Sequence, residues 1–258
     1  MNLSVSNIAW SSEDDDAIYA FLAEQGYTGL EIAPTRIFPD RPYDHLSEAK
    51  RFSDQLQNSY GLRIVSMQSI WYGIHENIFG SESERAFLVS YTKKAIDFAH
   101  TIGCKNIVFG CPKNRVLLSN NQFYLAEEFF LSIGQYAADH NTIIALEPNP
   151  PIYNTNFINT TNEAFDFCNQ LACDGLKVNV DLGTCIYYGE SIEIIQRNLP
   201  LVSHIHLSEP GLKPLQQRNL YRQLKSLDYD KYFSIEMASP HNLDMVKQTI
   251  RYVKDVMN

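Results

Sequence analysis

The sequence predicts a (β/α)₈ barrel formed by residues 1–258 as a single domain, and three observations support this. A length of 258 residues is typical of α/β barrels that form one domain. Short β-rich runs alternate with longer amphipathic stretches along the whole chain, as expected for βα units around a parallel sheet. The turn Ala9-Trp10-Ser11-Ser12 after the first run lacks the glycine-rich phosphate-binding pattern of a doubly wound open sheet, the main rival fold.

Eight runs have the length and residue types of buried strands, and eight longer stretches have helical periodicity. The predicted strands cover residues 3–9, 29–33, 63–67, 106–109, 143–147, 177–181, 202–207 and 232–236. The predicted helices cover residues 14–25, 47–59, 84–102, 122–140, 161–171, 191–198, 215–224 and 243–256. Equal numbers of alternating strands and helices indicate a closed barrel.

Capping signals mark several of the helix boundaries. Ser11 with Asp14, and Ser81 with Glu84, resemble capping boxes at helix N-termini. Three glycines follow helical stretches at positions typical of C-terminal caps: Gly26, Gly61 and Gly103.

Composition and charge exclude several classes of protein. Thirty acidic and 21 basic residues give a net charge of −9, which argues against a nucleic-acid partner. The five cysteines are widely spread and form no C-x-x-C pair, as expected for reduced thiols. The N-terminus lacks the features of a secretory signal, and no apolar stretch approaches the ~20 residues of a membrane span. We therefore expect a cytoplasmic protein without a membrane or nucleic-acid partner.

Ionisable residues stand at the ends of the last four predicted strands. They are Glu147 in I-A-L-E-P, Asp181 in V-N-V-D-L, His206 in S-H-I-H-L and Glu236 in F-S-I-E-M. Catalytic groups of barrel enzymes lie at the C-terminal ends of the strands, where side chains of several strands converge. His204 has the same strand parity as His206 and is expected either to donate a hydrogen bond to one of the ligands or to fill a layer of the barrel.

Three carboxylates at one barrel mouth would repel each other and raise each other's pKa, and a divalent cation removes that penalty. The predicted ligands are Glu147, Asp181, His206 and Glu236. An oxygen-rich set with one imidazole suits Mn²⁺ or Mg²⁺, and the nitrogen also admits Co²⁺ or Zn²⁺.

The order Glu, Asp, His, Glu on strands five to eight, with G-L-E-I-A-P at the second strand, resembles the xylose isomerase-like barrel family. This family contains sugar and sugar-phosphate isomerases and epimerases, and its superfamily contains AP endonucleases. The resemblance implies one divalent metal on the four ligands and proton exchange with the substrate through Glu147 and Glu236. It also implies a small-molecule sugar or sugar-phosphate substrate, and it is compatible with a homo-oligomer.

The implied chemistry is proton removal next to a carbonyl, with a Lewis-acidic metal stabilising the enediolate. Two active glutamates would give epimerisation, whereas one would give aldose–ketose isomerisation. Two alternatives remain open: a lyase of the inosose dehydratase type, in which the enolate expels a hydroxyl, and a sugar-binding barrel without turnover.

The chain departs from two branches of the family. The 3-epimerases that it resembles carry a histidine three residues after the aspartate and an arginine six residues after the metal histidine; here these places hold Thr184 and Leu212, followed by Lys213. This counts against a free-ketose 3-epimerase. The extra histidines of the AP endonuclease trinuclear zinc site are also missing, with Thr184, Gln68 and the turn 110–112 in their places.

Residues around the predicted mouth are candidates for substrate contacts. Glu31 would hold a hydroxyl or support a ligand, with a salt bridge to Arg36 as the structural alternative. Lys113, Arg115, Arg36 and Lys213 would hold an anionic group on the substrate, with solvated surface charge as the alternative. Glu209 is expected to pair with Lys213 or to contact substrate. The remaining candidates are aromatic or neutral polar side chains: Trp10, Gln68, Trp71, Tyr72, Asn149, Asn154 and Thr184.

Overall fold

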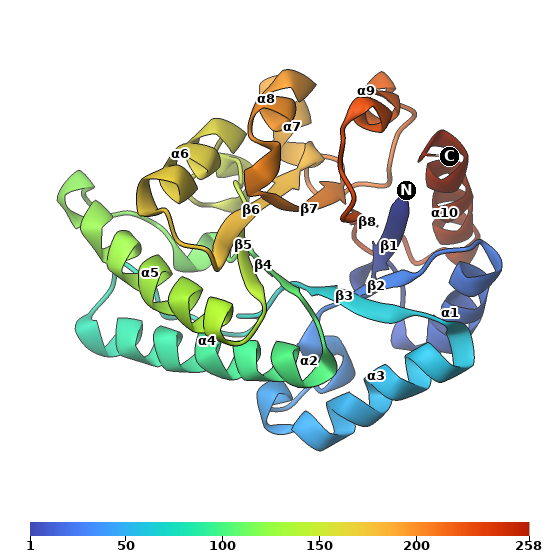
Figure 1. Cartoon of the computed structure of the whole chain (residues 1–258), viewed down its shortest axis with the longest axis horizontal. Coiled ribbons are helices and arrows are strands. Elements are labelled where there is room, and N and C mark those ends of the chain that lie inside the picture. The colour runs from blue at the N-terminus through green and yellow to red at the C-terminus, as the bar shows by residue number, and fades with distance from the viewer. Residues whose placement is uncertain (258) are drawn as a thin grey trace.

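The computed structural model describes residues 1–257 and contains a closed barrel of eight parallel strands in chain order (Figure 1). Strand β1 pairs with both β2 and β8, which closes the barrel. The strands are β1 (Asn2–Ser6), β2 (Gly29–Ile32), β3 (Arg63–Met67), β4 (Asn106–Phe109), β5 (Ile143–Leu146), β6 (Leu176–Asp181), β7 (Val202–Leu207) and β8 (Tyr232–Ile235). The predicted barrel is confirmed, and each strand lies within three residues of its expected bounds.

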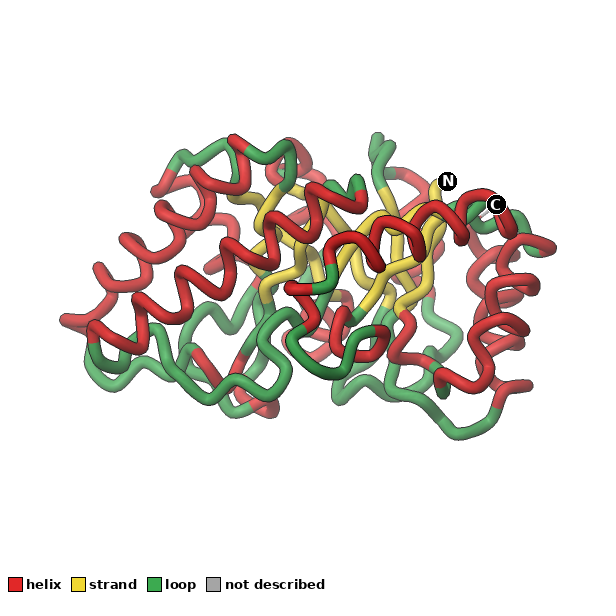
Figure 2. Tube along the Cα trace, turned by 90° about the horizontal axis from the view of Figure 1, so that it is seen from below, coloured by secondary structure: helices red, strands yellow, loops and turns green. Residues whose placement is uncertain are grey.

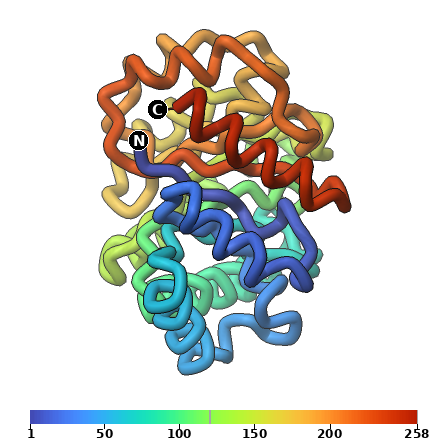
Figure 3. The backbone as a smooth tube through the Cα atoms, turned by 90° about the vertical axis from the view of Figure 1, so that its right-hand side faces the viewer, coloured from blue at the N-terminus to red at the C-terminus, as the bar shows by residue number. Residues whose placement is uncertain are grey.

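Helices surround the barrel (Figure 1). They are α1 (Asp15–Glu24), α2 (Pro34–Ile37), α3 (Leu46–Tyr60), α4 (Glu82–Ile102), α5 (Phe123–Asp139), α6 (Thr161–Leu171), α7 (Leu182–Tyr188), α8 (Ile192–Arg197), α9 (Asn219–Gln223) and α10 (Leu243–Met257). Helices α2 and α7 are additions to the predicted set, and α9 is shorter than the helix predicted at 215–224. Helix α10 returns to the start of the chain, so the two ends lie close together (Figure 3).

Helix ends explain where the predicted boundaries hold and where they fail. The Ser81 hydroxyl accepts from the Glu84 backbone N–H, and the Glu84 carboxylate accepts from the Ser81 N–H, so the predicted capping box is confirmed. The predicted box at Ser11 is wrong, because its side chain makes no capping bond and a 3₁₀ turn precedes α1. The first strand ends early because residues 7–9 form another 3₁₀ turn, in which the Asn7 side chain accepts from the Ala33 N–H.

Side chains alternate along the strands between an apolar outer face and a polar barrel interior. Outward residues such as Ile144 and Ile205 are fully buried beneath the helices. The interior positions include small or neutral polar side chains, namely Ser4, Ser66, Asn106, Asn179 and Ser234. Most long loops gather at the edge of the molecule opposite the N-terminus, at the C-terminal ends of the strands (Figure 2).

Two further properties concern the chain as a whole. Within residues 1–257, no helix has the length and apolar character needed to cross a membrane. All five cysteines are free thiols, as predicted from their spacing.

Gly175, just before β6, allows α5 to approach the barrel closely. A Cβ at this position would lie 2.0 Å from the Gly134 carbonyl oxygen and 2.8 Å from the Ala138 nitrogen, and both are backbone atoms. We expect Gly175→Ala to lower the free energy of unfolding by about 1–3 kcal/mol or more, since the helix must move away. Thermal denaturation would measure this. Gly26→Asn is the control, because Gly26 has open space around it and Asn tolerates its left-handed backbone; an equal loss in both variants would contradict the close-packing argument.

Candidate metal centre

Four neighbouring strands bring the predicted metal ligands together at their C-terminal ends. Glu147 directly follows β5, Asp181 ends β6, His206 lies near the end of β7 and Glu236 directly follows β8. One ligand atom of each residue lies within 4.8 Å of those of the other three, and all four residues are buried. Consecutive parallel strands thus place four residues, spread over 90 positions of sequence, around one point.

His206 directs one ring nitrogen at two of the carboxylates. Its Nδ1 lies 3.0 Å from Glu147 Oε1 and 3.1 Å from Glu236 Oε2. This nitrogen is buried and lacks a hydrogen bond of good geometry to any residue in the described part of the chain. Its Nε2 lies 3.0 Å from Glu31 Oε2. The side chain therefore has one nitrogen held by a partner and one free to bind a cation.

The electrostatics of the cluster show an excess of negative charge. Burial works to lower the pKa of His206, but Glu236, Glu31 and Glu147 outweigh it and hold that pKa well above its usual range. Burial raises the pKa of Glu236 to about 7 despite the nearby His206. Burial and the charge of Glu147 also raise the pKa of Asp181. A proton on His206 thus offsets part of the charge that a divalent cation would neutralise.

These features fit a divalent cation. The unpaired His206 Nδ1 faces the carboxylates, and three carboxylates with one imidazole form a donor set used by Mn²⁺, Co²⁺ and Zn²⁺. The residues that would hold the ion are Glu147, Asp181, His206 and Glu236.

Asp181 is oriented by its own helix and by β7. Its Oδ2 accepts hydrogen bonds of 2.8 Å from both the backbone N–H and the hydroxyl of Thr184, so Asp181 caps helix α7. Ser208 donates its hydroxyl to the other oxygen. Thr184 also donates to the Pro148 carbonyl and is fully buried. It therefore lies behind Asp181 and is not part of the pocket surface.

Glu147 is held by two amides and approached by a glycine. Asn179 donates to Oε1 at 2.7 Å, and Asn149 donates to Oε2 at 2.9 Å. A Cβ on Gly110 would lie 2.6 Å from Oε2, so the residue after β4 must be small for Glu147 to keep this position. Sequence reasoning missed Asn179, Ser208 and Gly110. Strand parity was an available signal for Asn179, which lies two residues before Asp181 on the same face.

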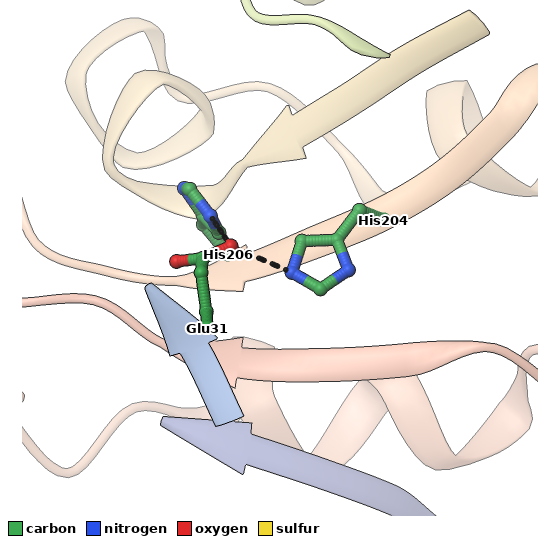
Figure 4. A group of neighbouring side chains, drawn as sticks. All are labelled: Glu31, His204 and His206. Atoms are coloured by element: carbon green, nitrogen blue, oxygen red, sulfur yellow. Dashed lines mark hydrogen bonds and ion pairs between the residues drawn. The ribbon is translucent and has the colours of Figure 1, made fainter. Parts of the chain in front are cut away.

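Glu31 connects His206 to His204 (Figure 4). It is fully buried, and its Oε2 lies 3.0 Å from His206 Nε2 and 3.1 Å from His204 Nε2. Gln68 donates to Glu31 Oε1 at 3.2 Å and to the Ser6 hydroxyl. Glu31 therefore orients the predicted ligand His206, as carboxylates commonly do for metal-bound imidazoles. The salt bridge to Arg36 is wrong, because Arg36 pairs with Asp15 at 2.6 Å.

A small polar pocket of about 140 Å³ opens onto the cluster. Glu147, Asp181 and Glu236 line it, together with the predicted residues Gln68 and Asn149. Tyr153 and Leu212 also line it. The Tyr153 hydroxyl accepts a hydrogen bond from the Gly211 N–H at 2.8 Å, which connects the loop after β7 to the loop after β5.

Neither tryptophan lines this pocket. Trp71 is 3% exposed, donates its indole N–H to Thr92 and stacks edge-on against Phe109 in the core. Trp10 is also 3% exposed and donates to Asp15. Both indole rings are buried against neighbouring side chains. Tyr72, the third predicted aromatic, is 74% exposed on the loop after β3.

None of the four basic residues predicted to hold an anionic group on the substrate lines the metal pocket. Arg115 is fully buried and donates to backbone carbonyls and to Asn149 Oδ1, so its prediction as a mouth residue is wrong. Arg36 is occupied by Asp15. Lys113 and Lys213 are exposed and do not line the metal pocket.

Two loop residues also differ from expectation. Glu209 pairs with Arg218 and accepts from Tyr221, so the predicted pair with Lys213 is wrong. Asn154 is exposed with a left-handed backbone and does not line the pocket, which suits a turn.

We expect Glu31→Gln to weaken metal binding about 10–100-fold, because an amide holds the His206 ring less firmly than a carboxylate. Isothermal titration with Mn²⁺ or Zn²⁺ would measure the change. Glu24→Gln, which removes an exposed carboxylate on α1, is the control. Unchanged affinity in Glu31→Gln would show that Glu31 does not support the site.

We expect metal affinity to rise with pH. A raised pKa means that His206 carries a proton which the cation must displace, and Glu236, with a pKa of about 7, loses its proton over the same range. Release of one proton corresponds to about tenfold in affinity for each pH unit below these pKa values. Titrations at pH 6 and pH 8, in buffers of different ionisation enthalpy, would count the protons. Affinity independent of pH would contradict this assignment.

The chain belongs to the xylose isomerase-like TIM barrel family, whose model matches residues 19–256. It is similar in structure to the 3-keto-D-glucoside 4-epimerase YcjR from E. coli, with a TM-score of 0.79, 16% identity and 99% coverage of both chains. It is also similar to D-psicose 3-epimerase from Clostridium cellulolyticum H10, with a TM-score of 0.79, 15% identity and coverage of 100% and 98%. The IOLI protein with a bound zinc atom gives a TM-score of 0.74, 16% identity and coverage of 100% and 98%. No curated protein matches the sequence.

Proposed function

We propose that the protein is a divalent-metal-dependent sugar isomerase or epimerase. The observation that carries this proposal is the placement of Glu147 and Glu236 in one small polar pocket, at 3.0 and 3.1 Å from the same free imidazole nitrogen. Both carboxylates can thus reach one bound molecule from different strands. The similarity to sugar epimerases and to a zinc-containing barrel supports the same class.

The four predicted ligands would hold the cation, which would supply positive charge next to a substrate carbonyl. Gln68 and Asn149 border the same pocket, and their amides, which also bond to Glu31 and Glu147, present a neutral polar surface to hydroxyls. With Arg36 and Arg115 occupied by protein partners, we favour a neutral sugar over a sugar phosphate.

Glu236 is the better placed of the two glutamates to exchange a proton. In the metal-free cluster burial raises the pKa of Glu236 to about 7, so its carboxylate is the more basic of the two. Glu147 has a lowered pKa, because His206 and Asn149 outweigh the effect of its burial. Such a difference between two carboxylates is typical of paired acid–base groups.

The test is deuterium incorporation from D₂O into a panel of free ketoses, aldoses and their phosphates, with Mn²⁺, Mg²⁺, Co²⁺ or Zn²⁺ added. We expect metal-dependent exchange at a carbon next to the carbonyl, with neutral sugars preferred. Mass spectrometry of the products separates isomerisation, which preserves mass, from the loss of water catalysed by a lyase. Tight metal binding without exchange for any sugar would contradict the proposal and favour a binding protein.

A further inference from the structure

A second cavity opens at the N-terminal end of the barrel, opposite the metal centre. Its volume is about 510 Å³, and residues from β3, β4, β5, β7 and β8 line it at the N-terminal ends of these strands. It shares no lining residue with the metal pocket. The proposed sugar reaction does not use it.

The cavity is large enough for a small organic molecule. Ile64, Ile143 and Tyr232 form part of its wall. Its volume of about 510 Å³ exceeds what a single water needs.

Buried polar groups face this space. Asn106 lines it and is 5% exposed, and its Oδ1 has no hydrogen-bond partner within the described residues, while its Nδ2 donates to Ser66 at 3.0 Å. His204 also lines the cavity, at 1% exposure. One of its ring nitrogens faces Glu31 and the other points away (Figure 4). An unpaired buried oxygen such as Asn106 Oδ1 is costly unless a ligand or water satisfies it.

The rim of the cavity is positively charged. Arg63, Lys105 and Lys231 line it with a single acid, Asp230, which gives a formal local charge of +2 in a chain of net charge −9. These residues come from the starts of β3, β4 and β8, and only the fold brings them together. Such a rim attracts an anion, and the guanidinium of Arg63 suits a phosphate.

We propose that this cavity binds a small phosphate ester that carries hydroxyl groups. The phosphate lies at the rim near Arg63, Lys105 and Lys231. The hydroxylated body extends toward the barrel interior, where a hydroxyl donates to Asn106 Oδ1 beside His204. Small size is required by the volume of about 510 Å³, and negative charge by the rim.

The test uses the whole protein, freed of metal with a chelator, and three probes: glycerol phosphate, inorganic phosphate and glycerol. Binding is followed by titration of backbone amide resonances. We expect saturable shifts with glycerol phosphate at Gly103, Lys105 and Asn106, weaker binding of inorganic phosphate, and none of glycerol. The double variant Arg63→Gln/Lys105→Gln should bind glycerol phosphate about tenfold more weakly. Lys50→Gln/Arg51→Gln on α3 removes the same charge elsewhere and should leave the affinity unchanged.

Several outcomes would overturn this proposal. Absence of saturable binding by glycerol phosphate would do so, as would shifts confined to the metal pocket around Glu147 and Asp181. Equal weakening in both double variants would indicate attraction to overall charge rather than a site. Equal affinity for inorganic phosphate and glycerol phosphate would show that the hydroxylated part of the molecule makes no contact that contributes to binding. Both double variants change exposed side chains, so loss of folding is not expected, and thermal denaturation verifies this.

Discussion

Glu236→Gln is expected to lower the rate of deuterium exchange into the substrate by about 10²–10⁴-fold, the usual contribution of a positioned acid–base group. The amide has the same shape as the carboxylate but cannot accept the proton. Glu236 lines the pocket, where its carboxylate can reach a bound substrate. Exchange would be measured by NMR at saturating metal, so that weaker metal binding does not enter the rate.

Two comparisons make this result specific. Glu24→Gln removes a carboxylate exposed on α1 and should exchange at the normal rate. Glu147→Gln tells epimerisation from isomerisation, because an epimerase needs a group on each side of the substrate. If Glu236→Gln binds metal and still exchanges at the normal rate, then another group carries the proton.

Arg115→Met is expected to lower the free energy of unfolding by about 3–5 kcal/mol, although within residues 1–257 the guanidinium is bonded only to carbonyls and an amide. The guanidinium is fully buried and donates to the Glu147 carbonyl at 2.7 Å, to Asn149 Oδ1 at 2.6 Å and to the Phe157 carbonyl at 2.9 Å. Methionine fills similar space and leaves these acceptors without a donor. Because all three belong to the segment between β5 and α6 that carries Glu147, metal affinity should also fall.

Chemical denaturation would measure the loss of stability, and thermal denaturation should show about 2–4 °C for each kcal/mol in a chain of this size. The control is Arg51→Met on α3, where the arginine side chain is 75% exposed. If both variants are equally stable, the loop after β5 is held by other contacts.

Much of the fold and the central cluster could be predicted from residue patterns. Strand alternation and helical periodicity are local, and they identified all eight strands. The rule that strand ends converge in a barrel then sufficed to group Glu147, Asp181, His206 and Glu236. Their grouping followed from chain order because consecutive strands are neighbours in the barrel.

The partners of individual charged residues could not be predicted in this way. Arg36 follows β2 and was expected near Glu31, but the turn of α2 brings it to Asp15 at the start of α1. Arg115 stands in a loop, where solvent is the ordinary environment of arginine, yet the loop after β5 folds over it. Which side chain satisfies a charge depends on the path of loops, and local periodicity contains no information about that path.

The sequence by itself therefore determined the barrel and the four residues at the ends of its last strands, because both depend on short-range periodicity and strand order. The tertiary structure alone decided that Glu31 reaches across the barrel to His206, 175 positions away. It also decided that Trp71 enters the core and that cations from three strands surround the cavity at the N-terminal end. Each of these depends on barrel closure and strand register, which set distances between residues that no local pattern relates.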